Sequence, residues 1–358
     1  MTAVLTPAEV AAMRAAAQLV LHAPASSVSD VADRVVAFQA QDFGAGCWSV
    51  GLRARTGTGR SDVLAALADG RLVRSWPLRS TLQIVGCDAV RPMLAVTGAR
   101  NLRAMAGRRR QLGLDDAELG RGEAFARELL AAGPIRRTHL MAAFDARGLS
   151  TAGQRGAHLL LALALTGVLC FGPPDGKQHT FVLLDHWVPQ VDLQDDPLPW
   201  LAARYAESHG PVRVADFAWW AGITKTEAAR GFAEAAPALV EMPAEGGPVF
   251  VGRDSPALDA ALVAGARSTV AVLPSFDELL LGYADRSAAL PRGRQDLVAP
   301  GANGLFHPVL SVGGRVVGTW RAKRGRSGTT VLPEPFDGET LPEGFEEAAT
   351  RFAEFDVS

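Results

Sequence analysis

Cysteine and lysine are scarce in this chain of 358 residues. The three cysteines, Cys47, Cys87 and Cys170, stand far apart and form no CxxC pair, which argues against a disulfide framework or a cysteine zinc site. The seven histidines are dispersed, and no two lie four residues apart as metal ligands on one helix face would. We therefore predict buried thiols in a reducing compartment, and neither a metal nor another cofactor.

The chain also lacks a long apolar run and a strong charge of either sign. Its longest apolar run, 159–171, is too short to span a membrane, and the apolar N-terminal stretch is interrupted by Glu9 and Arg14, unlike a signal peptide. The net charge of −2 excludes a histone-like polycation, although clustered arginines can still bind DNA. With 48% hydrophobic residues, the sequence predicts a globular, cytoplasmic protein with two or three domains.

Gln39-Ala40-Gln41 is the segment that most strongly suggests a functional site. Apolar residues at 31, 35 and 38 predict an amphipathic helix, and Gly44 and Gly46 favour its end near the motif. In a helix, residues two apart point about 200° apart, whereas in extended backbone alternate side chains share a face. We therefore predict an extended segment that directs both amides at one target.

Two alternatives remain open around this motif. Taken alone, the pattern also fits two helix-end glutamines that bond to nearby backbone. Asp42, the next residue, is either a further polar group of the site or a helix-end partner for an arginine.

The N-terminal part of the chain has the outline of a winged helix. Thr6, Pro7 and Glu9 form the signature of a capping box at the start of a first helix, and a second helix begins near Asp30. A strand-like stretch over 48–55 and a hairpin over 71–85, with Pro77 near its tip, complete the outline.

A repeat 77 residues apart predicts two more copies of this unit. Gly133-Pro134 precedes predicted helices over 138–147 and 151–166, with a break at Gly148 and strands around 172–176. Gly210-Pro211 precedes helices over 213–220 and 224–236, with a break at Gly222 and strands around 246–247. We interpret Trp219 and Trp220 of the last copy mainly as core.

Short β-prone runs over 268–273, 305–312 and 315–321 predict a small β-rich C-terminal domain with the outline of a partial barrel. The acidic last twenty residues are expected on the surface, away from DNA. The predicted fold class is therefore α+β, with three tandem winged helix-turn-helix repeats and a β-rich C-terminal domain. The predicted domains are 1–115, 116–192, 193–262 and 263–358.

Two clusters of basic residues are candidates for phosphate contact. The first lies in residues 91–110, which contain no acid, and the second lies in residues 315–326 beside Trp320. A solvated helix face and a β-turn surface are the alternative interpretations. The candidate DNA contacts are Arg79, Arg108, Arg109, Arg110, Arg321, Lys323 and Arg324.

Four stretches, in the same order, resemble the AlkZ/YcaQ family of winged-helix DNA glycosylases. They are residues 35–42 with the Gln-Ala-Gln motif, 74–83, 276–286 (FDELLLGYADR) and 314–321. The resemblance extends from about residue 6 to residue 325. The AlkZ branch carries a Gln-x-Gln catalytic motif, which Gln39 and Gln41 match, and the YcaQ branch carries Gln-x-Asp. Relatives commonly have His where this chain has Gln83.

The resemblance implies a monofunctional DNA glycosylase with Gln39 and Gln41 as catalytic residues. Its substrates would be bulky or cationic N7- or N3-alkylated purines in double-stranded DNA, with genotoxin self-resistance and crosslink unhooking as extensions. We expect a monomer without a membrane partner. A non-catalytic winged-helix transcription regulator and an inactive protein that sequesters adducts are the alternatives.

Lysine scarcity argues against a lyase reaction, which needs a nucleophilic amine. Lys177 falls at a predicted hairpin turn and Lys225 at a helix start. Lys323, among arginines that would lower its pKa, is the one serious candidate, and phosphate binding is its simpler use.

Overall fold

Helix α1 (Pro7–Ala17) begins at the predicted capping box. The Thr6 side chain accepts a hydrogen bond from the Glu9 N–H, and the Glu9 carboxylate accepts one from the Thr6 N–H at 2.8 Å. Helix α2 (Val28–Val35) begins with the same reciprocal pair, made by Ser27 and Asp30. These bonds satisfy N–H groups that the first turn of a helix leaves without partners.

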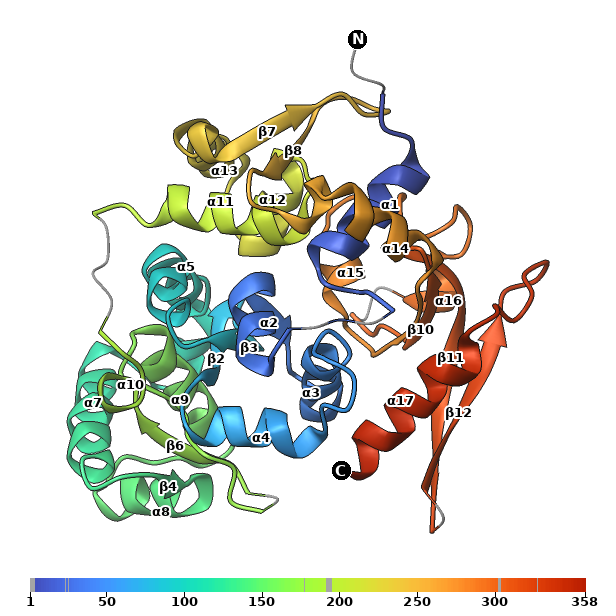
Figure 1. Cartoon of the computed structure of the whole chain (residues 1–358). Coiled ribbons are helices and arrows are strands. Elements are labelled where there is room, and N and C mark those ends of the chain that lie inside the picture. The colour runs from blue at the N-terminus through green and yellow to red at the C-terminus, as the bar shows by residue number, and fades with distance from the viewer. Residues whose placement is uncertain are drawn as a thin grey trace. The chain divides into compact units, whose positions relative to one another are not determined.

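The computed structural model describes residues 4–22, 24, 26–176, 178–190, 195–301, 304–326 and 328–358. The chain forms two compact units (Figure 1). The first combines Met1–Val63 with Leu198–Ser358, and the second is Leu64–Pro197. The division into four domains stays a prediction, and its first domain, 1–115, contains residues of both units. Lys177, expected at a hairpin turn, lies outside the described residues.

In the second unit, the predicted helix-turn-helix and strand order is confirmed. Helices α8 (Arg137–Ala146) and α9 (Arg155–Leu165) flank a turn in which Gly148 has a φ of 73°. Strands β4 (Ile135–Arg136), β5 (Leu169–Phe171) and β6 (Thr180–Leu183) form an antiparallel sheet of order β4-β6-β5. The core of this unit lies between these helices and the sheet and includes Phe144, Leu163 and Phe181.

In the first unit, the corresponding later copy is confirmed as well. Helices α12 (Val214–Ala221) and α13 (Lys225–Glu234) are joined through Gly222, which adopts the left-handed conformation that a glycine tolerates best. The hairpin of β7 (Leu239–Met242) and β8 (Val249–Gly252) follows. Trp220 is fully buried, as predicted, but Trp219 is 45% exposed, so the interpretation of Trp219 as core is wrong.

A four-stranded antiparallel sheet of order β12-β11-β10-β9 occupies the C-terminal part of the chain. Its strands are β9 (Val270–Leu273), β10 (Val309–Val312), β11 (Arg315–Gly325) and β12 (Gly328–Pro335). Three of them coincide with the predicted β-prone runs, whereas β12 was not predicted. Strands β11 and β12 form a long hairpin (Figure 1).

The acidic C-terminal segment lies at the surface, as expected, with most of its acids exposed, and its distance from DNA stays a prediction. It forms helix α17 (Phe345–Val357), whose face with Phe345, Phe352 and Phe355 is buried. These aromatic residues recur at helical spacing, so the helix packs one face on the fold and turns its acids outward.

The remaining elements are mostly helices. The predicted strand over 48–55 is wrong, because its first half belongs to helix α3 (Phe43–Gly51) and the rest forms a turn. Helix α3 is buried on more than one side and therefore shows no helical periodicity. The hairpin over 71–85 is confirmed as β2 (Leu72–Leu78) and β3 (Thr81–Gly86). The other helices are α4 (Arg60–Ala68), α5 (Val90–Ala104), α6 (Ala106–Gln111), α7 (Asp116–Leu130), α10 (Leu184–Trp187), α11 (Leu198–His209), α14 (Ala260–Ser268), α15 (Glu278–Leu281) and α16 (Gln295–Val298). Among the described residues, no helix has the length and apolar character needed to cross a membrane.

Candidate active site

Gln39 and Gln41 lie in a short segment between α2 and α3. Strand β1 (Ala37–Gln39) carries the first glutamine. Phe38 and Ala40 are fully buried, Gln39 is half-buried and Gln41 is exposed. The predicted extended backbone is confirmed for Ala37–Gln39, and Gln41 lies at the bend that leads into α3. Both glutamines are more accessible than Phe38 and Ala40.

The turn into this segment is made by a strained residue. Val36, directly after α2, has a φ of 73°, a value that a β-branched residue rarely adopts. Its N–H still donates to the Ala32 carbonyl at 3.0 Å, and its side chain is buried. Such strain persists only where the surrounding packing holds it, and it is concentrated at functional sites.

Helix α3 lies directly against the backbone of the glutamine segment. A Cβ atom on Gly46 would stand 2.7 Å from the Ala40 Cβ and 2.9 Å from its Cα. Only a glycine permits this approach without displacement of the segment. The Asp42 carboxylate caps α3 by accepting the Ala45 N–H at 3.0 Å. Asp42 therefore has a helix-end role, and the donor that it binds there is a backbone N–H.

A buried ion pair lies next to the glutamine segment, beside the Phe38 ring. The Arg53 guanidinium, 0% exposed, donates to the two Asp277 carboxylate oxygens at 2.7 and 2.9 Å. It also lies 5.4 Å from the centre of the Phe38 ring. Ser49 Oγ on α3 donates to the same carboxylate at 2.9 Å. Loss of one partner of such a pair costs about 3–5 kcal/mol, because the other charge stays buried.

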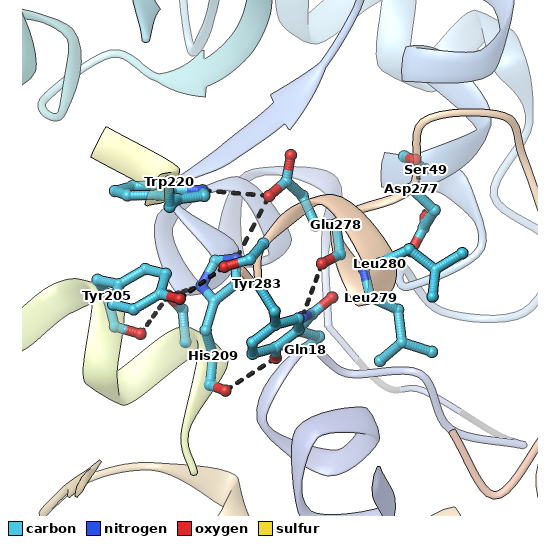
Figure 2. A network of polar contacts seen from close by, with 12 residues as sticks. Gln18, Ser49, Tyr205, His209, Trp220, Asp277, Glu278, Leu279, Leu280 and Tyr283 are labelled. Atoms are coloured by element: carbon cyan, nitrogen blue, oxygen red, sulfur yellow. Dashed lines mark hydrogen bonds and ion pairs between the residues drawn. The ribbon is translucent and has the colours of Figure 1, made fainter. Parts of the chain in front are cut away.

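The polar network continues through Glu278, next to Asp277 (Figure 2). Glu278, 2% exposed, accepts the Trp220 indole N–H at 3.1 Å and lies 3.4 Å from His209 Nε2. The Tyr283 hydroxyl donates to the His209 carbonyl at 2.8 Å and accepts from Gln18 at 2.9 Å (Figure 2). Burial lowers the pKa of His209, against the opposing effect of Glu278.

The Arg53–Asp277 pair and the polar network around Glu278 were not predicted from the sequence. Residues 276–286 contributed only to the family resemblance, although two adjacent acids inside an apolar stretch already signalled buried, paired carboxylates. The network joins α1, α3, α11, α12 and α15 of the first unit, and Arg53 connects it to Phe38 of the glutamine segment.

A family model described as "DNA glycosylase AlkZ-like" matches residues 32–355. The chain belongs to the AlkZ-like DNA glycosylase family. It is 26% identical over 330 residues to the interstrand DNA cross-link repair glycosylase of Streptomyces sahachiroi, covering 88% of this chain and 87% of that protein. The solved structure of the Streptomyces sahachiroi DNA glycosylase AlkZ aligns with a TM-score of 0.81 at 25% identity, over 99% of this chain and 98% of that one. The mixed α+β fold is thus the fold of an AlkZ-like glycosylase.

The first basic cluster of this AlkZ-like chain lies on α5 and α6, in the second unit, and its three candidate DNA contacts are on α6. Arg108 donates to Gln111 at 2.9 Å and to Gln154 at 2.6 Å. Arg109 lies 3.4 Å from the Asp116 carboxylate, and Arg110 is exposed. Arg79, the other candidate of this unit, sits half-buried in the β2–β3 turn with a φ of 48°. The three α6 arginines adjoin one another, and their contact with DNA stays a prediction.

The second basic cluster lies on β11, in the first unit. Arg321 pairs with Glu334 at 2.8 Å and Arg324 with Asp356 at 2.7 Å, while Lys323 is exposed. The bond to Asp356 chiefly, with a smaller effect of Asp42, raises the pKa of Arg324. Both arginine side chains are still at least 65% exposed, and their contact with phosphate stays a prediction.

Gln83 faces Ser75 across the β2–β3 hairpin. Its side chain is 1% exposed and donates to Thr81 Oγ1 at 2.8 Å. Among the described residues, its Oε1 and the Ser75 Oγ are buried without a hydrogen-bond partner. An unsatisfied buried acceptor costs about 1–3 kcal/mol. Gln83 is thus held inside its hairpin, and no role in the reaction is assigned to it.

The cysteines and possible metal ligands do not form a site in the described part of this AlkZ-like chain. Cys47 and Cys170 are buried, as predicted, and Cys87 is half-buried. Burial raises the pKa of Cys170, which keeps that thiol protonated. The described residues contain no group of three or more His, Cys, Asp or Glu side chains arranged to hold a metal ion.

Proposed function

We propose that this chain is a monofunctional DNA glycosylase that removes N7- or N3-alkylated purines from duplex DNA. One observation carries the proposal: Gln39 and Gln41 have accessible side chains on a rigidly supported segment in a chain of the AlkZ-like family. Their type and spacing match the catalytic motif implied by the family resemblance.

The chemistry suits two neutral amides. Cleavage of the bond between the sugar C1′ and the purine nitrogen leaves the electron pair on the base. Alkylation at N7 or N3 has already made the base cationic, so it departs neutral and needs no proton. A strong general acid is therefore unnecessary, and the catalytic task is to stabilise the cationic sugar.

Gln39 and Gln41 perform that task through their carbonyl oxygens. Each amide offers an acceptor oxygen and a donor nitrogen, so the pair orients a water and places two dipoles near C1′. The water oxygen bonds to C1′ and its proton passes to solvent. Preorganised dipoles of this kind contribute about 100- to 1,000-fold each. Val36, Gly46 and the Arg53–Asp277 pair supply the preorganisation.

DNA binding fits the repeated architecture. Each of the two helix-turn-helix and hairpin units has the outline of a winged helix, and a third one in residues 1–115 stays a prediction. The arginines of α6 and β11 are our candidates for phosphate contacts, which give binding without sequence preference. By analogy with the cross-link repair glycosylase of Streptomyces sahachiroi, bulky adducts and interstrand cross-links belong to the proposed substrate range.

Alkali cleavage of a lesion duplex tests the proposal. The substrate carries one N7-methylguanine, and hot alkali converts each abasic site into a strand break resolved on a gel. We expect breaks with the wild type, none with Gln39→Ala/Gln41→Ala, and normal breaks with Gln295→Ala, a change at an exposed glutamine on α16. Tight binding of the duplex without base release would identify a binding protein instead.

Borohydride trapping tests the monofunctional character. A lyase forms a Schiff base between an amine and the sugar, which borohydride reduces to a covalent adduct. We expect an intact abasic strand and no protein–DNA adduct. An adduct that disappears in Lys323→Arg would replace water attack with amine attack.

A further inference from the structure

The unit that carries Gln39 and Gln41 also contains a large cavity. Its volume is about 770 Å³, and its walls come from α3, β11, α17 and the segments around residues 274 and 336. Cavities of about 300–1,000 Å³ are the size class that encloses drug-sized organic ligands. The cavity is therefore large enough for a purine together with a substantial substituent.

The floor of the cavity is aromatic. Trp48 of α3, Trp320 of β11, and Phe352 and Phe355 of α17 line it, and Phe352 packs edge to face with both indoles. The two indole N–H groups already donate to the carbonyls of Val272 and Leu273, each at 2.8 Å. Trp48 and Trp320 are 3% and 5% exposed, so the surface that they turn to the cavity is small and apolar, with no indole donor to satisfy. Such a surface suits the edge of an apolar ring system.

Charged groups surround this floor. The Arg321–Glu334 and Arg324–Asp356 pairs line the cavity, and so does Asp42. Asp42 directly follows Gln41 in the chain, so the cavity lining begins one residue beyond the glutamine pair. Donors and acceptors at the rim match the polar edge of a purine, while the floor matches an aromatic substituent.

We infer that this cavity receives the extruded alkylpurine, with the substituent against the Trp48 and Trp320 floor. The inference rests on the proposed glycosylase function and names the subsite that would favour aromatic adducts. Enzymes that act on a base commonly take it out of the stack into a pocket. Contacts between an aromatic substituent and these rings would then raise kcat/KM for an aromatic adduct above kcat/KM for a methyl adduct.

Filling the cavity tests the inference. Ala322 on β11 lines the cavity, whereas Thr330, on the neighbouring strand β12, is exposed and outside the lining. We expect Ala322→Trp to lower kcat/KM for N7-benzylguanine in duplex DNA by about 10-fold or more relative to N7-methylguanine. Thr330→Trp should leave the ratio unchanged. If Ala322→Trp does not fold, as judged by urea unfolding, Ala45→Leu fills the cavity from α3 and must lower the same ratio. An unchanged ratio in the folded filling variant overturns the inference.

A binding measurement separates this inference from the proposed function. Saturation-transfer NMR with free 7-benzylguanine reports contact with the cavity without any excision. We expect a signal with the wild type and Thr330→Trp and its disappearance in the folded filling variant, whether or not any base is released from DNA. Absence of the signal in the wild type, or its persistence in the filled variant, overturns the inference.

Discussion

Replacement of Gly46 by alanine perturbs the glutamine segment from the side of α3. The new Cβ would lie 2.7 Å from the Ala40 Cβ, whereas carbon atoms in contact prefer about 3.5–4.0 Å. The helix and the segment must therefore separate by roughly 1 Å. A displacement of about 1 Å in a catalytic group can cost about 100-fold in rate. We expect Gly46→Ala to reduce excision by that order.

Stability should change much less than activity in this variant. Alanine favours a helix over glycine by about 1 kcal/mol, which offsets part of the roughly 1–3 kcal/mol cost of overpacking. The assay is single-turnover release of N7-methylguanine with protein in excess, alongside urea unfolding monitored by circular dichroism. A large fall in rate with a small shift of the unfolding midpoint is the expected combination.

Gly265→Ala on α14 is the matched control in the same unit. A Cβ there would meet no atom within 4 Å. We expect this variant to release the base at the wild-type rate. If Gly46→Ala is folded and equally active, the close approach of α3 does not position the glutamines, and this part of the reasoning fails.

Three further predictions concern DNA binding, metals and pH. Charge should be removed in two variants, one at Arg108, Arg109 and Arg110 and one at Arg321 and Arg324. We expect the slope of log affinity against log salt concentration to become shallower by about 0.9 for each phosphate that is no longer neutralised. Unchanged slopes in both variants would show that DNA binds to another face. Excision should survive excess EDTA, and inactivation that zinc or magnesium reverses would contradict the mechanism. Burial lowers the pKa values of His158, His179 and His209 in the folded state, so the unfolded chain binds protons more readily below the ordinary histidine pKa of about 6.5. The free energy of unfolding should therefore fall as the pH is lowered from 8 to 5.5, and it should fall less steeply in His209→Gln. A profile without pH dependence would refute the lowered histidine pKa values.

The local structure of the glutamine segment was predictable, because it depends on short-range signals. The period of the apolar residues and the following glycines correctly placed a helix end and extended backbone at Gln39. Capping residues and Gly-Pro starts likewise located α1 and both later helix pairs. Each of these signals acts over a few residues, so the sequence displays it directly.

Contacts between distant residues were not predictable in the same way. Helix α3 was misread as a strand because burial on several sides removes the alternation that marks a half-exposed helix. The Arg53–Asp277 pair joins residues more than 200 positions apart, and no spacing rule connects them. Helix α17 was not predicted, although its aromatic residues recur on one face. The cavity depends on all of these contacts and had no sequence signal.

The most direct test of the central claim is the single-turnover excision rate of Gln41→Ala, measured with its affinity for lesion DNA. We expect Gln41→Ala to lower the rate by about 100-fold, which is the scale for removal of one preorganised dipole, and Gln39→Ala to lower it less. The dissociation constant should stay unchanged, because neither amide is needed for phosphate contact, and Gln295→Ala should behave as wild type. Release of N7-methylguanine at the wild-type rate by both motif variants would contradict the account.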